Sequence, residues 1–265
     1  MGALELLRER DANWVDGAGQ IRLVVPPALF VVSEKPRAPR ARAAPPSPYM
    51  SWSKSSLDIA EVVLTKVGDR LTIPDLEVAS GWSKPQVSIV LREFDRLGWT
   101  SRHGPGRGPN VYRELKDPGV LLDAWTEHLT RHRPRRILGH RLMRDATALL
   151  REEIAPVLCE RSGWAATGWA GLALTAPHLT STPTLQIYLT PDLFDRADAL
   201  QRDCGIRPVE DGGNIEFWET RLLLVHSASG GIPVINLPRL YVDLMALGGR
   251  ATEGATFLRE GLIGF

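Results

Sequence analysis

Apolar residues recur at the spacing of amphipathic helices in three consecutive segments, 53–69, 72–81 and 83–98. Each segment begins with Ser or Thr residues suited to cap a helix and ends at a glycine suited to stop one. Because only a tight turn separates the second segment from the third, the pattern predicts a helix-turn-helix. The expected caps and stops are Ser55 or Ser56 with Gly68, Thr72 with Gly81, and Ser83 with Gly98, and the expected core stripe of the third helix is Val87, Val90, Leu91, Phe94 and Leu97.

The third helix leads into RHGPGRGPNVY, residues 102–112. Glycines in a basic context are typical of a phosphate-binding loop, but such a loop lies between a strand and the start of the next helix. Here a helix comes first, and the flanking segments WTSR and NVYREL favour two strands joined by a glycine-rich tip. The order predicts a winged helix-turn-helix over residues 51–115, with an unrelated hairpin as the alternative.

Residues 116–144 contain an amphipathic helix followed by RHRPRRILGHRLMR, residues 131–144, with six arginines, two histidines and no acid. We expect this basic stretch to be a hinge, a second phosphate-contacting surface or a solvated linker. Residues 145–265 mix helical and strand patterns. In that part DATALLREEIAPVL and DLFDRADALQRD predict helices, GWAATGWAGLAL a small-residue helix, TLQIYLT and TRLLLVHS strands, GIRPVEDGGNIEFWE two strands about a Gly212–Gly213 turn, and LPRLYVDLMALGG and EGATFLREGL two final helices.

Residues 1–50 contain a short helical segment, the apolar run IRLVVPPALFVV and a proline- and arginine-rich stretch over 34–48. Pro26 and Pro27 exclude a central strand and allow an edge strand or an extended arm. The stretch 34–48 is typical of a semi-rigid linker, with a DNA-contacting arm as the alternative. The predicted fold class is therefore α+β, a winged helix-turn-helix followed by a mixed α/β C-terminal domain, with divisions at 1–50, 51–115, 116–144 and 145–265.

Charge is distributed unevenly along the chain. Residues 1–144 hold 23 Lys and Arg against 16 Asp and Glu, a net charge of +7, whereas residues 145–265 hold 9 against 15, a net charge of −6. A basic half favours nucleic acid as a partner because neutralising phosphates releases counterions, although surface charge can also drift along a chain without a partner. No run of about 18 apolar residues and no signal-peptide pattern occurs, so we expect a cytoplasmic protein that does not enter a membrane.

The face of the third helix opposite its core stripe carries the candidate DNA-binding residues. Residues 82–113 hold six Lys and Arg against two acids, a net charge of +4. Recognition helices bring their N-terminal residues to base edges in the major groove, and a glycine-rich hairpin can approach a phosphate or the minor groove. A protein-interaction module is the alternative. The predicted base-reading residues are Lys84, Gln86 and Ser88, the predicted phosphate contact is Arg92, and the predicted hairpin contacts are Arg102, His103, Arg107 and Asn110.

No strong catalytic signature is present. HSASGG lacks the G-x-S-x-G arrangement, and carboxylate pairs such as Asp192 and Asp195 fit an ordinary helix surface. Cys159 and Cys204 belong to no metal-ligand cluster, and we expect both to be buried, inert thiols. We therefore expect no enzymatic activity, no cofactor and no metal.

The order of these parts resembles the AbiEi-type antitoxins of bacterial type IV toxin–antitoxin systems. The similarity extends over roughly residues 51–265, and YVDLMALGGRATEGATFLRE near the C-terminus is its most telling piece. About 50 residues precede the predicted winged helix here, whereas in many such antitoxins it opens the chain. The other pieces that carry the resemblance are GWAATGWAGLAL, TLQIYLT and GGNIEFWE.

The resemblance implies a dual role. The winged helix would bind inverted repeats in the promoter of its own operon and repress it, and the protein would counter a nucleotidyltransferase-like toxin. The DNA contacts it implies are the helix and hairpin residues already named, without His103 and Asn110. One alternative is a winged-helix transcriptional regulator whose C-terminal domain senses a small ligand, and another is an enzyme that acts on nucleotides.

Overall fold

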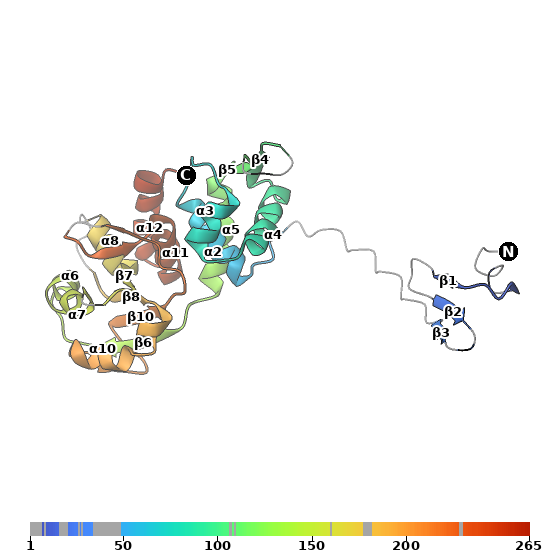
Figure 1. Cartoon of the computed structure of the whole chain (residues 1–265). Coiled ribbons are helices and arrows are strands. Elements are labelled where there is room, and N and C mark those ends of the chain that lie inside the picture. The colour runs from blue at the N-terminus through green and yellow to red at the C-terminus, as the bar shows by residue number, and fades with distance from the viewer. Residues whose placement is uncertain are drawn as a thin grey trace. The chain divides into compact units, whose positions relative to one another are not determined.

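The computed structural model of the chain describes residues 7, 9–15, 21–25, 27, 29–33, 49–105, 108, 110–159, 161–176, 182–227 and 230–265. The chain divides into two compact units, Met1–Tyr49 and Met50–Phe265 (Figure 1). In the first unit, β1 (Trp14–Val15), β2 (Ile21–Val25) and β3 (Leu29–Ser33) form an antiparallel sheet in that order. The apolar run IRLVVPPALFVV thus supplies two paired strands, with its prolines between them in the sequence. The prediction that these prolines exclude a central strand was wrong, because β2 is the middle strand of the sheet and ends before them. The linker predicted over 34–48 lies outside the described residues.

The second unit begins with three helices, a hairpin and a fourth helix. The element bounds confirm the three predicted helices, the predicted hairpin and the amphipathic helix that follows it. Most of the apolar residues at helical spacing in these helices are buried, with Val87, Leu91 and Phe94 of the third helix fully so. Val78 of the second helix is 84% exposed, so it does not belong to the core, and Leu97 is only half-buried. The elements are α2 (Lys54–Leu64), α3 (Ile73–Ser80), α4 (Lys84–Arg96), β4 (Thr100–His103), β5 (Tyr112–Leu115) and α5 (Pro118–Arg131).

Capping residues determine where α2 and α3 begin. The Thr72 hydroxyl accepts from the Asp75 N–H at 3.3 Å, as predicted for α3. In α2 the cap is Ser53, so the prediction of Ser55 or Ser56 was wrong. The Ser53 hydroxyl accepts from the Ser56 N–H at 3.2 Å, while the Ser53 N–H donates to the Ser56 hydroxyl at 2.8 Å. This reciprocal arrangement satisfies two backbone donors, and it needs Ser56 inside the first turn.

The rest of the second unit is built on a seven-stranded mixed sheet with the strand order β11-β12-β7-β8-β10-β6-β9. β12 with β7 and β8 with β10 pair in parallel, and the other neighbours are antiparallel. The strands are β6 (Arg136–His140), β7 (Trp164–Thr167), β8 (Leu185–Leu189), β9 (Arg207–Pro208), β10 (Ile215–Glu219), β11 (Val225–Ser227) and β12 (Pro233–Ile235).

Helices pack against this sheet and against one another. One helical stretch comprises α6 (Ala146–Leu149), a π-helical turn (Leu150–Ile154) and α7 (Ala155–Cys159). Helix α8 contacts β7, β8 and β12, and α9 contacts β8 and β10. The remaining helices are α8 (Gly168–Thr175), α9 (Pro191–Phe194), α10 (Ala197–Asp203), α11 (Leu237–Leu247) and α12 (Ala251–Leu258), which a π-helical turn (Arg259–Ile263) extends.

Three predictions in this part were wrong. GWAATGWAGLAL is half strand, because residues 164–167 lie in the middle of the sheet with both faces buried, where small residues allow close packing. The two strands of GIRPVEDGGNIEFWE do not form a hairpin, because β6 lies between β9 and β10. β6 itself comes from the basic stretch 131–144, so residues 136–140 are a sheet strand and not a hinge or linker.

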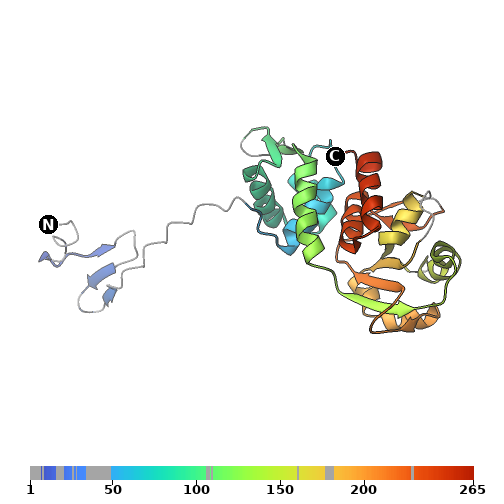
Figure 2. The ribbon, with the colours of Figure 1, turned by 180° about the vertical axis from the view of Figure 1, so that it is seen from behind.

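Within the second unit we call residues 50–131 the helical part and residues 132–265 the sheet part. Helix α11 of the sheet part packs against the helical part. It contacts α2 and α5 on one side and α8 and α12 on the other. Figure 2 shows α5 leading from the hairpin region past α11 to β6. Residues of both parts belong to one hydrophobic core, so Met50–Phe265 is a single compact unit. The divisions predicted after residues 115 and 144 stay predictions. Within the described part of the chain, no helix has both the length and the apolar character to cross a membrane.

Candidate nucleic-acid interface

The β4–β5 hairpin is attached to the helices by backbone pairing. The Leu71 N–H donates to the Arg113 carbonyl at 2.8 Å, and the Arg113 N–H donates to the Leu71 carbonyl at 2.9 Å. Leu71 lies between α2 and α3, so it adds a short third strand position beside β5. The hairpin is therefore held in register with the helices.

A buried ion pair also fixes the hairpin to α4. The Arg113 side chain is 5% exposed, and its Nε donates to both carboxylate oxygens of Asp95 at 3.0 Å. The Thr100 hydroxyl donates to the same carboxylate at 2.6 Å. Arg113 counts toward the basic excess of the sequence, but its charge is neutralised by Asp95 inside the fold.

Arg96 is also paired, since its Nε donates to Glu93 at 2.9 Å. The two acids of residues 82–113 are thus both engaged by cations of the same segment. The excess charge of the segment therefore rests on its other four cations. These are Lys84, Arg92, Arg102 and Arg107, of which Arg107 lies outside the described residues.

The exposed face of α4 carries two of these cations. Lys84 is exposed, with its Nζ 3.6 Å from a carboxylate oxygen of Glu77. Arg92 is exposed and its Nε donates to the Ser88 carbonyl at 3.3 Å. Ser88, Arg92 and Arg102 line one open hollow between α4 and the hairpin. The structure therefore brings together three of the predicted contact residues from the two elements.

Gln86 has a local role besides the predicted one. Its Oε1 accepts from the Ser83 hydroxyl at 2.8 Å and from the Ser83 N–H at 3.3 Å, which caps the start of α4. A bidentate contact to adenine needs both the oxygen and the amino group of glutamine. As long as the cap is intact, Gln86 has only its amino group to offer a base.

On the hairpin, His103 lies against Tyr112, with ring centroids 5.2 Å apart, and its Nε2 is 3.0 Å from the Ser101 hydroxyl. Asn110 is exposed at the far side of the tip. A Cβ on Gly104, whose φ is +93°, would lie 2.2 Å from the Asn110 carbonyl oxygen. The close approach of the two hairpin arms therefore requires glycine at this position.

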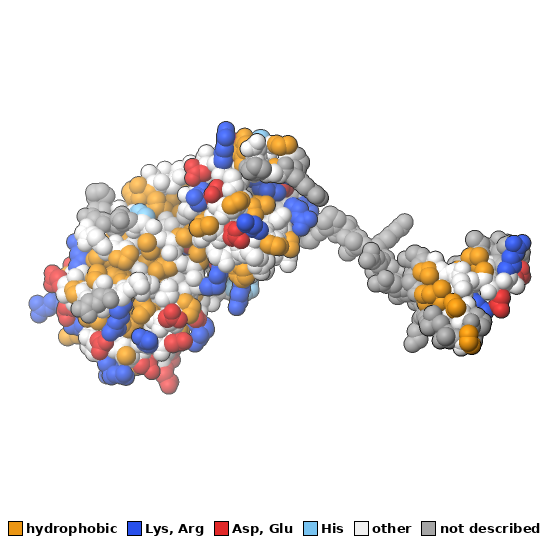
Figure 3. Space-filling model, in the orientation of Figure 1, with side chains coloured by type: hydrophobic (Ala, Val, Ile, Leu, Met, Phe, Trp, Pro, Cys, Tyr) orange, Lys and Arg blue, Asp and Glu red, His pale blue; other side chains and the backbone are white. Residues whose placement is uncertain are grey.

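The charged surface of this region is mixed. In Figure 3, basic, acidic and hydrophobic side chains are interspersed over the surface of the helical part. One exposed hydrophobic residue, Ile89, lies on α4 itself and is 58% exposed. Ile89 lies on the face of α4 opposite its core stripe, but it was not among the predicted DNA contacts.

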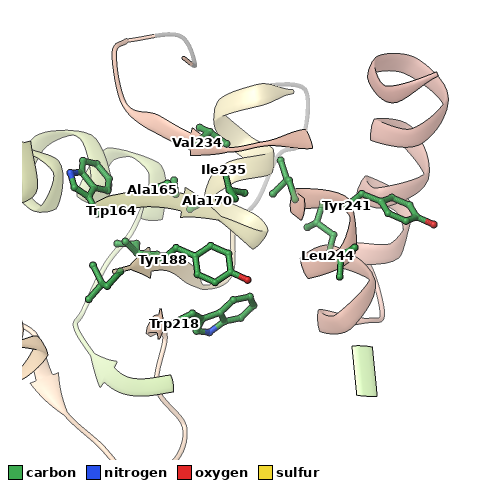
Figure 4. Packing of buried hydrophobic residues seen from close by; sticks show 14 of the residues in the cluster. Trp164, Ala165, Ala170, Tyr188, Trp218, Val234, Ile235, Tyr241 and Leu244 are labelled. Atoms are coloured by element: carbon green, nitrogen blue, oxygen red, sulfur yellow. The ribbon is translucent and has the colours of Figure 1, made fainter. Parts of the chain in front are cut away.

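A second charged cluster, buried between α2, β8 and α11, had no signal in the sequence analysis. Its members are Glu61, Tyr188, Arg239 and Asp243, and we call it the buried cluster. Arg239 Nη1 lies 3.3 Å from Glu61 Oε2, and its Nε lies 3.4 Å from Asp243 Oδ1. The Tyr188 hydroxyl accepts from Arg239 Nη2 at 2.7 Å and donates to Asp243 at 2.9 Å. Figure 4 shows the Tyr188 ring extending from β8 beside Trp218.

The buried cluster contains one cation and two carboxyls. Burial raises the pKa of Glu61 to about 7, against the lowering effect of Arg239 and of the hydrogen bond from Asn236. Burial also raises the pKa of Asp243 and of Tyr188. A carboxyl that takes up a proton near neutrality avoids a second uncompensated charge in the interior. The cluster joins α2 to β8 and α11, and its Arg239 and Asp243 also line a small cavity between α5, β6, β10 and α11.

Neither cysteine belongs to a site. Cys204 is buried as predicted, but Cys159, at the C-terminal end of α7, is exposed, so that prediction was wrong. In the described part of the chain, no three His, Cys, Asp or Glu side chains converge as a metal site would require.

Comparisons with protein-family models, with curated proteins and with solved structures find no match to this chain. The similarity to AbiEi-type antitoxins accordingly stays an expectation from the sequence.

Proposed function

We propose that α2, α3, α4 and the β4–β5 hairpin form a winged helix-turn-helix that binds double-stranded DNA. One observation carries this proposal. Ser88 and Arg92 of α4 and Arg102 of the hairpin line one open hollow, so polar and cationic side chains of both elements meet at one surface. A surface of this kind favours phosphate because each neutralised phosphate releases counterions.

The proposed binding mode follows from the element order. Helix α4 would enter the major groove with Lys84 and Ser88 toward base edges, and Arg92 would contact a phosphate. Arg102 and the hairpin tip would lie against the neighbouring phosphates or the minor groove. Gln86 would contribute through its amino group, since its oxygen caps α4.

We further propose that the protein is a cytoplasmic transcriptional autorepressor and the antitoxin of a type IV toxin–antitoxin system. In this role it would bind inverted repeats in its own promoter and counter a nucleotidyltransferase-like toxin. The similarity of residues 51–265 to AbiEi-type antitoxins supports the proposal. The net charge of −6 over residues 145–265 supports a separate role for the sheet part.

The DNA-binding proposal is tested with the purified full-length protein and the DNA upstream of its own gene. Affinity for this duplex and for a scrambled duplex of equal composition is measured at two salt concentrations. Tight, sequence-preferring binding that weakens with salt is expected. Equal affinity for both duplexes would contradict the repressor role and favour a protein-contact module.

The antitoxin proposal is tested by co-expression with a neighbouring gene that encodes a nucleotidyltransferase-fold protein. If that protein alone arrests growth, co-expression is expected to restore it. Failure to restore growth would contradict the antitoxin role. Charge reversal at the exposed residues Asp192, Asp195, Glu210 and Asp211 then asks whether the acidic surface contributes to toxin neutralisation.

A second candidate function is a winged-helix regulator with a ligand-sensing C-terminal part. Its site would be a partly open cavity of about 20 Å³ where α5, β6, β10 and α11 meet, which as it stands holds a water-sized group and would have to widen for a metabolite. Its lining includes Arg136, Trp218, Arg239, Val242 and Asp243. A ligand there would contact the helical part and the sheet part at once. A metabolite that raises the Tm and alters DNA affinity would favour this function over the antitoxin role.

A further inference from the structure

We propose that Ile89 is a specificity-determining residue that contacts the C5-methyl group of a thymine in the bound DNA. The inference rests on the DNA-binding function proposed above. It adds a base identity that the polar residues of α4 do not specify.

Ile89 projects from α4 on its exposed face. Its side chain is 58% exposed, whereas the neighbouring Val87 and Val90 are buried. Ile89 lies one helical turn after Gln86 and one turn before Arg92, so the three share one face. It is the apolar member of the face proposed to meet base edges.

Ile89 also borders a hollow on each side of α4. Two open hollows flank α4, one lined by Ser88, Arg92 and Arg102 and the other by Ser53, Gln86 and Glu93, and Ile89 lines both. Ile89 is therefore the ridge between two hollows that each contain hydrogen-bonding side chains beside apolar ones. The hydrophobic core and its partly buried rim do not include it.

The major groove of DNA offers an apolar group that Ile89 can contact. The methyl group of thymine is the apolar feature that base pairs present there, and apolar side chains contact it. Isoleucine in a helix holds one main χ1 rotamer, so ordering it on a base costs little conformational entropy. An exposed isoleucine beside hydrogen-bonding residues thus fits a thymine next to the bases that those residues read.

The test begins with a duplex obtained by selection from a randomised pool against the full-length protein. Each thymine of that duplex is replaced singly by deoxyuridine, which removes only the methyl group. We expect affinity to fall about fourfold at one position in each recognised half-site, which is the effect of exposing one methyl-sized group. Ile89→Ala should bind the thymine duplex about fourfold more weakly and should not distinguish thymine from deoxyuridine at that position.

Two further variants control for indirect effects. Ile89→Val keeps a branched apolar side chain and should retain most of the discrimination. Leu142→Ala truncates another exposed apolar residue, 92% exposed and located after β6, and should bind like the parent protein.

The outcomes separate the two proposals. Selection that yields no preferred sequence would overturn the DNA-reading function and this inference together. A preferred sequence whose affinity is unchanged by every deoxyuridine would overturn the inference alone. So would an Ile89→Ala variant that keeps the full sensitivity to deoxyuridine, or one that loses self-association in the absence of DNA, which would make Ile89 a protein contact.

Discussion

Arg92 on α4 and Arg239 on α11 carry the same guanidinium group in opposite settings. Arg92 is exposed, and its Nε bonds a backbone carbonyl of its own helix. Arg239 is 13% exposed and lies among Glu61, Tyr188 and Asp243. The first cation leaves its charge available to a partner, whereas the second has its charge balanced within the fold.

A count of basic residues in a segment therefore does not locate a binding surface. Arg113 and Arg96 lie in the same basic segment as Arg92, yet both pair with acids from α4. Surface ion pairs of the Arg96 kind contribute about 0–1 kcal/mol, whereas removing one partner of a buried pair costs about 3–5 kcal/mol. Each charge should therefore affect either stability or DNA binding, and variants can separate the two.

The largest effect is expected from Arg239→Met. This change leaves two buried carboxyls without their cation and the Tyr188 hydroxyl without its donors, so the free energy of unfolding should fall by about 3–5 kcal/mol. Urea denaturation measures it. Arg92→Met is the matched control and should change stability by less than about 0.5 kcal/mol. Equal losses in the two variants would break the comparison.

The pH dependence of stability tests Glu61. Its pKa is raised from 4.5 in the unfolded chain to about 7 in the fold. Between these values the folded state binds the extra proton, so the free energy of unfolding falls as pH rises and levels off above about pH 7. The full fall amounts to about 3 kcal/mol.

Glu61→Gln removes this titration. Relative to the variant, the parent protein should lose stability between about pH 4.5 and pH 7, as measured by urea denaturation at each pH. Glu77→Gln, on the exposed face of α3, serves as the control and should not alter the pH profile. A parent and a Glu61→Gln variant with parallel profiles would show that Glu61 does not take up a proton in the fold.

Arg92→Ala should weaken DNA binding by about tenfold at 0.1 M salt and lower the slope of log K against log salt by about 0.9, as expected for one lost phosphate contact. Lys84→Ala should instead relax discrimination at one base position and leave the slope unchanged, as expected for a base-reading residue. Fluorescence anisotropy with the selected duplex measures both values. Stability should not change, because both side chains are exposed. A slope lowered by Lys84→Ala would contradict its base-reading role and make Lys84 a phosphate contact.

The smallest effect is expected from Ser88→Ala. The Ser88 side chain lines the hollow between α4 and the hairpin, and loss of one neutral hydrogen bond to a base should reduce discrimination at one position by about 1 kcal/mol. Competition between single-base variants of the selected duplex measures it. Unchanged preference at every position would remove Ser88 from the base-reading set.

Much of the fold of residues 53–131 was predictable because the caps of α3 and α4, the glycine stops Gly81 and Gly98 and the helical periodicity agree there. For α2 both ends were wrong, since it is capped by Ser53 and ends at Leu64, before the predicted stop Gly68. The sheet part was less predictable. Residues 164–167 read as helix because Trp, Ala and Thr carry no period-two pattern when both faces of a strand are buried. β6 was hidden by Arg136 and by Arg135 just before it, which lie beside acids of β10: Arg135 is 3.1 Å from Glu219, and Arg136 is 3.3 Å from Glu216.

The exposed face of α4 and the buried cluster also differ in how far the sequence predicts them. The exposed face of α4 follows from local spacing, since its members lie within three turns of one helix. The buried cluster joins Glu61, Tyr188 and Arg239 from three distant segments, and only the i, i+4 spacing of Arg239 and Asp243 is local. No pattern within a short window indicates such a cluster, because the tertiary fold creates it.

The most direct test of the DNA-binding face compares two triple variants on the selected duplex over a salt series. Lys84→Ala/Arg92→Ala/Arg102→Ala removes the described exposed cations of the proposed interface, and Arg151→Ala/Arg202→Ala/Arg207→Ala removes three exposed cations of the sheet part. We expect the first to lower the salt slope by about 1.8, because Arg92 and Arg102 are its proposed phosphate contacts, and the second to leave it unchanged. Equal slopes for both triple variants, or a loss confined to the second, would contradict DNA binding by α4 and the hairpin.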